Sequence, residues 1–81
     1  MVLNWSRMRV DPSSSQSERW EAQHGTTTLS VFRSRMDGLW SYEINARSRD
    51  LEQVETGEVT GSFEEAKRAA CARASDRNLL S

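Results

Sequence analysis

The 81-residue chain has little of several residue types on which secreted, metal-binding and membrane proteins depend, with one cysteine, one histidine and one proline. A single cysteine forms neither a disulfide within the chain nor a zinc cage of cysteines. No apolar run approaches the roughly 20 residues of a membrane span, and the N-terminus lacks the apolar stretch of a secretory signal. We therefore expect a soluble, cytoplasmic protein without a membrane segment.

The arrangements that most enzymes need are also missing. The chain has no glycine-rich phosphate loop, no paired cysteines or histidines at metal-ligand spacing, and no nucleophile with an evident base. His24 stands beside a glycine at a predicted turn, where a solvated or capping role is typical. A domain of this size buries only roughly 60% of its unfolded surface, which leaves no room for a large substrate cavity. We predict no enzymatic activity, no cofactor and no metal site.

Charge is balanced overall but unevenly distributed. Eleven basic and twelve acidic residues give a net charge of −1, so the chain has no general basic field for nucleic acid or an anionic membrane. Four arginines nevertheless gather between residues 33 and 49: Arg33, Arg35, Arg47 and Arg49. The stretch from residue 50 to residue 65 carries acids alone. Any nucleic-acid binding must therefore use a local patch of these arginines.

The N-terminal part of the chain contains a linker-like segment. Residues 11–17 hold the proline and four serines, a composition typical of an exposed loop. We therefore predict an N-terminal arm and linker over residues 1–17 and a small domain over residues 18–78. Residues 19–24 alternate apolar and polar side chains as in a short half-buried strand, and a helix that starts at Ser17 is the alternative.

The middle of the chain predicts a β-hairpin. Residues 26–35 and 39–47 are rich in strand-forming side chains and flank a turn at Met36-Asp37-Gly38. A weaker strand candidate follows at residues 53–60, after a polar loop at residues 48–52.

The register of this hairpin decides where the arginines point. A two-residue turn would place Arg33 and Arg35 on the same face as the rings of Trp40 and Tyr42. A three-residue loop shifts the pairing by one residue, sets Phe32 opposite Tyr42 and turns both arginines toward an open face. Because an arginine is almost never buried without a partner, we predict the second register. It leaves two apolar residues for the first strand or the arm to cover: Leu29 and Val31.

A C-terminal helix is the clearest element. Ser62 and Glu65 have the spacing of a capping box, and strong helix formers follow through residue 74. The small residues on one stripe of this helix, Ala66, Ala70 and Ala74, would let it lie close on a sheet. The predicted fold class is therefore α+β, a three- to four-stranded antiparallel sheet with one C-terminal helix packed on one face.

Short motifs in the hairpin and helix resemble known DNA-binding domains. Arg33-Ser34-Arg35, Gly38-Leu39-Trp40 and Glu43-Ile44, followed by the Ser62-Phe63-Glu64-Glu65-Ala66 helix start, are similar to the Apetala-type domain of plant ethylene-response factors and the arm-binding domains of phage integrases. The resemblance implies three strands and a helix, with the sheet in the DNA major groove. It further implies that two arginines face DNA and two apolar residues face the helix: Arg33 and Arg35, and Trp40 and Ile44.

Two further resemblances concern the helix and the order of elements. Residues 61–70 are similar to the last helix of double-stranded-RNA-binding domains, with Lys67 as the one matching lysine. The strands-then-helix order resembles HicB-type antitoxins, which implies a protein partner.

We therefore expect a non-catalytic binding module, of phage or mobile-element origin, that contacts a protein through an open sheet face. Trp5 and Trp20 lie outside the obvious core, and tryptophan is enriched at tight interfaces. A core this small also needs its large rings, so packing within the chain is the alternative role of both.

Two other binding modes compete with this one. The first is DNA or RNA binding through the four arginines, Arg33, Arg35, Arg47 and Arg49, which would weaken steeply with added salt. The second is self-association through sheet edges or open faces.

Overall fold

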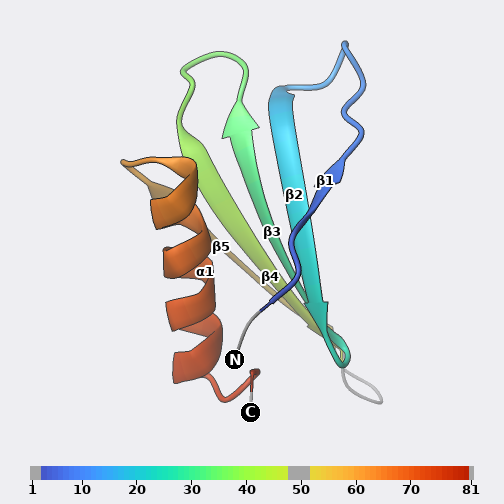
Figure 1. Cartoon of the computed structure of the whole chain (residues 1–81), viewed down its shortest axis with the longest axis vertical. Coiled ribbons are helices and arrows are strands. Elements are labelled where there is room, and N and C mark those ends of the chain that lie inside the picture. The colour runs from blue at the N-terminus through green and yellow to red at the C-terminus, as the bar shows by residue number, and fades with distance from the viewer. Residues whose placement is uncertain (1–2, 48–51, 81) are drawn as a thin grey trace.

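The computed structural model describes residues 3–47 and 52–80, which form an antiparallel sheet and one helix (Figure 1). The sheet has five strands in the order β1-β2-β3-β4-β5, each antiparallel to its neighbour. The elements are β1 (Ser6–Met8), β2 (Gln16–His24), β3 (Thr27–Ser34), β4 (Trp40–Arg47), β5 (Glu52–Val59) and α1 (Phe63–Asp76). The predicted α+β class is confirmed, with five strands instead of three to four.

The additional strand comes from the N-terminal segment that we predicted as an arm. Ser6, Arg7 and Met8 of β1 pair with the middle of β2, and β2 already begins at Gln16. Residues 9–15 form the connection between these two strands. The strand predicted for residues 19–24 is confirmed, and the alternative helix from Ser17 is wrong.

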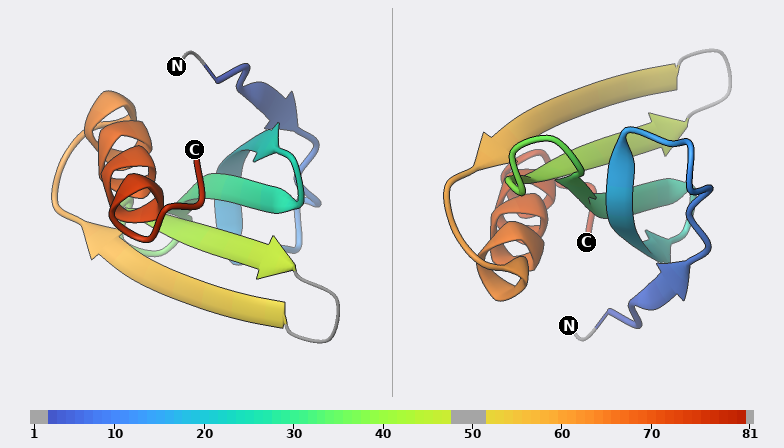
Figure 2. Two further views of the ribbon diagram at one scale, coloured as in Figure 1. Left: turned by 90° about the horizontal axis from the view of Figure 1, so that it is seen from below. Right: turned by 90° about the horizontal axis from the view of Figure 1, so that it is seen from above.

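Helix α1 begins and packs as its sequence predicts. The Ser62 hydroxyl accepts a hydrogen bond from the amide of Glu65, at 3.4 Å. Ala66, Ala70 and Ala74 are fully buried against the sheet. Because these side chains are small, the helix lies close on β3 and β4, and it covers one face of the sheet only (Figure 2).

The hairpin register that we predicted is wrong by one residue. Arg33, not Ser34, pairs with Trp40, and Phe32 lies opposite Ser41 instead of Tyr42. A hydrogen bond from the Ser34 amide to the Leu39 carbonyl, at 2.9 Å, closes a loop of four residues, from Arg35 to Gly38. Gly38 adopts the left-handed conformation, with φ of 71°.

Burial of aliphatic side chains explains this register. It turns Leu29 and Val31 toward the helix, where they are 1% and 0% exposed. Complete burial of such a side chain is worth about 1.5–3 kcal/mol. Arg33 occupies the last position of the same face, where it remains exposed, so the register buries no guanidinium. The prediction failed because we assumed that the core face extends as far as residue 33.

Candidate functional site

The face of the sheet opposite α1 has no covering element among the described residues. Side chains alternate between the two faces of a strand, so the neighbours of the core positions point away from the helix. We call this surface the helix-free face, with Arg19 and Glu21 on β2, Ser30 and Phe32 on β3, and Ser41 and Glu43 on β4 at its centre.

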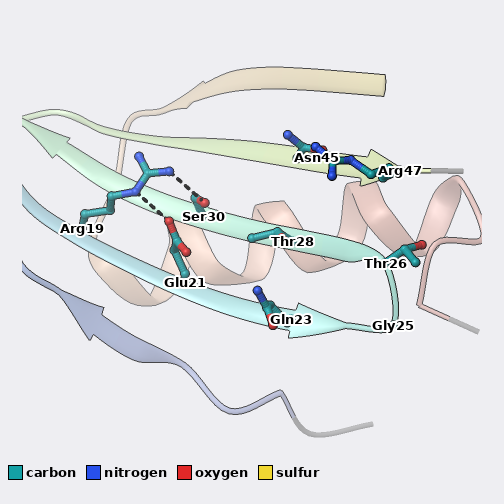
Figure 3. Close-up of a pocket in the computed structure, with 9 residues that line it drawn as sticks. All are labelled: Arg19, Glu21, Gln23, Gly25, Thr26, Thr28, Ser30, Asn45 and Arg47. Atoms are coloured by element: carbon teal, nitrogen blue, oxygen red, sulfur yellow. Dashed lines mark hydrogen bonds and ion pairs between the residues drawn. The ribbon is translucent and has the colours of Figure 1, made fainter. Parts of the chain in front are cut away.

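One end of the helix-free face is hollowed into a polar trough (Figure 3). Its volume is about 460 Å³. Gln23, Thr28 and Asn45 line it between Arg19 at one end and Arg47 at the other. Another hollow of this face lies over β3, β4 and β5, around Phe32, Ser41 and Thr56, with a volume of about 600 Å³.

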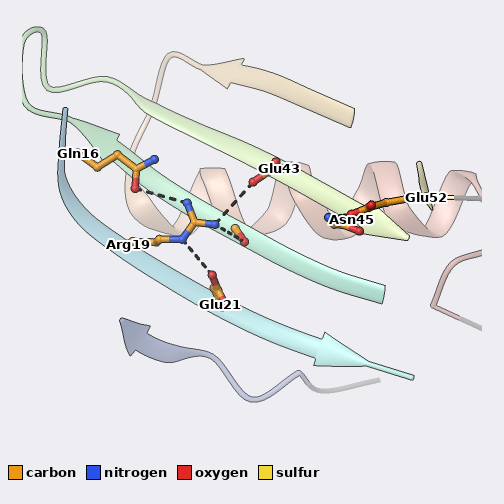
Figure 4. A network of polar contacts seen from close by, with 7 residues as sticks. Gln16, Arg19, Glu21, Glu43, Asn45 and Glu52 are labelled. Carbon is orange, nitrogen blue, oxygen red and sulfur yellow. Dashed lines mark hydrogen bonds and ion pairs between the residues drawn. The ribbon is translucent and has the colours of Figure 1, made fainter. Parts of the chain in front are cut away.

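Arg19 lies at the centre of the helix-free face and contacts side chains of three strands (Figure 4). Its guanidinium donates to the carboxylate of Glu21 at 3.0 Å and to the hydroxyl of Ser30 at 3.1 Å, and lies 3.6 Å from the carboxylate of Glu43. The same group lies over the ring of Phe32, 5.5 Å from its centroid. Partners on β2, β3 and β4 therefore hold one arginine in a fixed position, with only 24% of its side chain exposed.

Sequence reasoning did not identify Arg19 as a functional residue. The available signal is the spacing of Arg19 and Glu21, which places opposite charges on one face of a strand while Trp20 and Ala22 face the core. The acids that Arg19 meets across the sheet depend on the register of the hairpin, which the sequence does not fix.

Arg33 and Arg35 lie at the end of the sheet formed by the β3–β4 connection. Arg33 donates from Nε to the carbonyl of Gly38 at 3.0 Å. Arg35 donates to the carbonyls of Ser14 and Gln16, each at 3.1 Å, and so ties this connection to the one between β1 and β2. Neither arginine forms an ion pair with any residue that the structure describes.

The other two predicted arginines are not part of this cluster. Arg47 is the last residue of β4, whereas Arg33 pairs with Trp40, the first residue of the same strand. Arg47 lies seven residues after Trp40, which corresponds to about 23 Å along a strand. It lies 3.8 Å from the carboxylate of Glu52, and both side chains are largely exposed. Arg49 lies outside the described residues.

Trp5 and Trp20 are both half-buried and pack on the core. The ring of Trp20 lies 5.0 Å from that of Phe63, and its Nε1 donates to the carboxylate of Glu18 at 2.6 Å. Trp5 contacts both groups of buried core residues, so it joins the two halves of the core.

Ion pairs attach the C-terminal half of α1 to β5. The carboxylate of Glu55 accepts hydrogen bonds from Arg73 and from Arg77, the latter at 2.6 Å. The two guanidinium groups hold the pKa of Glu55 below its usual value. Burial raises the pKa of the Cys71 thiol, which keeps this group in its unreactive neutral form.

Within residues 3–47 and 52–80, no three histidine, cysteine, aspartate or glutamate side chains gather in a way that could hold a metal ion. In the part of the chain that the structure describes, no helix has the length and apolar character needed to cross a membrane. Comparison of the chain with models of protein families, with curated proteins and with solved structures finds no match.

Proposed function

We propose that the chain is a non-catalytic module that binds another protein through its helix-free face. The observation that carries this proposal is Arg19, held in place over the ring of Phe32 at the centre of a face that no described element covers. Arginine and aromatic side chains are enriched among the residues that contribute most to protein interfaces.

The fixed position of the Arg19 side chain favours binding. A guanidinium that already has fixed partners loses little side-chain entropy when a second protein covers it. The hollows on either side of the Arg19 and Phe32 pair offer space for side chains of the partner. The net charge of −1 supports a protein partner over nucleic acid, and we place the protein in the cytoplasm.

Proximity labelling in the source cells tests this function. Tagged wild type is compared with Arg19→Ala, with Ser41→Lys, which fills the hollow beside Phe32, and with Arg68→Ala, a control on the exposed side of α1. We expect proteins that wild type and the Arg68 variant both label and that both face variants lose, while thermal melting shows all four chains folded. An identical set of labelled proteins in all four samples would contradict the proposal.

Nucleic-acid binding is the second candidate function. It is favoured by Arg33 and Arg35, which donate to backbone carbonyls and have no carboxylate partner within the described residues. The resemblance to integrase arm-binding domains points to the same two residues and to a phage or mobile-element origin.

A titration of ¹⁵N-labelled protein with short DNA and RNA duplexes at low salt tests this second function. Binding through two phosphate contacts would give amide shifts around residues 33–39 and a logarithmic salt slope of about −2. The double variant Arg33→Ala and Arg35→Ala would lose both. No binding at low salt, or an affinity that does not change with salt, would exclude it.

A further inference from the structure

Strand β5 forms a long free edge of the sheet. All eight of its residues pair with β4 in one constant register, without a bulge. No strand of the described residues pairs with its other side. The opposite edge of the sheet, β1, is only three residues long.

The three glutamates of this edge oppose a further strand of like charge, but the edge lacks the other features by which proteins prevent the addition of a further strand. Edge strands are commonly short, or carry a lysine, a proline or a bulge that interferes with a new hydrogen-bonded neighbour. β5 contains no lysine, arginine or proline, and its register does not shift. Its backbone is therefore a template for an extended segment, as in binding by strand addition.

The side chains of β5 indicate the chemistry of such a segment. Glu55, on the helix side, already has Arg73 and Arg77 as partners. On the helix-free side, Glu58 has no ion pair with any described residue. Glu52 accepts a hydrogen bond from the amide of Asn45 at 3.0 Å and lies 3.8 Å from the guanidinium of Arg47. The ion pair is between exposed groups, which makes it weak. Two carboxylates at the ends of the strand thus flank two exposed residues on the same face: Val54 and Thr56.

We propose that β5 accepts an extended segment of a partner protein as a sixth strand, and that this segment carries a lysine or arginine at each end of a seven-residue stretch with β-branched residues between. Antiparallel pairing would set the two cations opposite Glu52 and Glu58 and the β-branched side chains beside Val54 and Thr56. The proposal rests on the proposed protein-binding function and adds where one segment of the partner binds.

A second copy of the chain fits this edge less well. Pairing of two β5 strands would bring six glutamates together, because each strand contributes Glu52, Glu55 and Glu58 and neither contributes a cation. Like charges opposite one another destabilise a strand pair. The occupant is therefore a different, basic segment.

The probe is the capped peptide Lys-Thr-Val-Thr-Val-Thr-Lys, titrated into ¹⁵N-labelled protein. We expect amide shifts and slowed hydrogen exchange along β5. We also expect at least tenfold weaker binding of two control peptides, one with glutamate in place of both lysines and one with proline at the central position.

Charge reversal on the protein completes the test. Glu58→Lys and Glu52→Lys should each weaken binding of the lysine peptide and strengthen binding of the glutamate peptide. Asp76→Lys makes the same charge change at an exposed position of α1, where the nearby charge is Arg73 and not Glu52 or Glu58. Because solvent and salt screen such a charge, it should alter binding of either peptide by no more than about twofold. Thermal melting must show that the fold tolerates each of these three substitutions.

Three results would overturn the proposal. The first is equal binding of all peptides, and the second is an absence of shifts in β5. The third is concentration-dependent dimerisation through β5 without peptide, which would assign the edge to a second copy. If Arg19→Ala abolishes labelling of partners in cells while Glu58→Lys leaves it unchanged, the protein-binding function stands and only the strand-addition site fails. Ser41→Lys does not enter this comparison, because Ser41 lies directly opposite Glu58.

Discussion

At the scale of single residues, two glycines are required for different reasons, one because a side chain would clash and the other because of its backbone conformation. A Cβ atom at Gly57 would lie 2.5 Å from the ring of Tyr42, whereas a Cβ at Gly25 would meet no atom within 4 Å. Gly25 instead has a φ of 61°, which side-chain-bearing residues rarely adopt. The first position therefore has no space for a methyl group, and the second has space but an unsuitable backbone.

We expect Gly57→Ala to destabilise the protein by about 1–3 kcal/mol, because the Tyr42 ring must leave its packed position. Gly25→Ala should cost about 1 kcal/mol, because only left-handed backbone strain opposes it. Urea unfolding of the two variants measures both values. A neutral or stabilising Gly57→Ala would show that the ring does not rest on this strand.

The ion pairs of Glu55 give a prediction on pH. In the folded state, a hydrogen bond from Arg73 and a weaker contribution from Arg77 lower the pKa of Glu55 below its usual value of 4.5. The stabilisation is therefore present above the unfolded-state pKa and is lost as the pH falls through the folded-state pKa. Thermal melting of wild type and Glu55→Gln should show wild type more stable at pH 7 and the two curves converging in acid. A difference that does not change with pH would rule out the ion pairs as its cause.

At the scale of elements, the stripe of alanines on α1 sets the distance between the helix and the sheet. Ala70 is fully buried, whereas Ala72, half a turn further along, is exposed. We expect Ala70→Leu to cost about 1–3 kcal/mol, because the larger side chain forces the helix off β3 and β4. Ala72→Leu should change stability by less than about 0.5 kcal/mol. Denaturant unfolding of both variants compares them directly, and equal effects would contradict the assigned helix face.

The elements themselves were more predictable than their register. The helix start and its buried face follow from Ser62, Glu65 and the alanine spacing, all of which are local signals. The pairing of Arg33 with Trp40 depends on the burial of Leu29 and Val31 under a helix that begins only at Phe63. For the same reason the sequence could indicate an open sheet face but not the central position of Arg19 on it.

At the scale of the whole molecule, the chain is so small that its core requires residues from both termini. Trp5 packs on both groups of buried residues, and Leu79 and Leu80, beyond the end of α1, pack on one of them. The N-terminal segment looked like a separate arm in the sequence because its apolar residues follow no clear period. Their role depends on the core that the rest of the chain leaves incomplete.

Trp5 therefore distinguishes a structural from an interfacial role for the N-terminal segment. If its ring completes the core, Trp5→Ala should destabilise the protein by about 2 kcal/mol, somewhat less than a fully buried tryptophan, because Trp5 is half-buried. Met8→Ala, a control on the same segment with a side chain 38% exposed, should cost less. Urea unfolding gives both values, and proximity labelling under conditions where both variants are folded should recover the same proteins as wild type. Unchanged stability together with lost partners would instead assign the Trp5 ring to the binding surface.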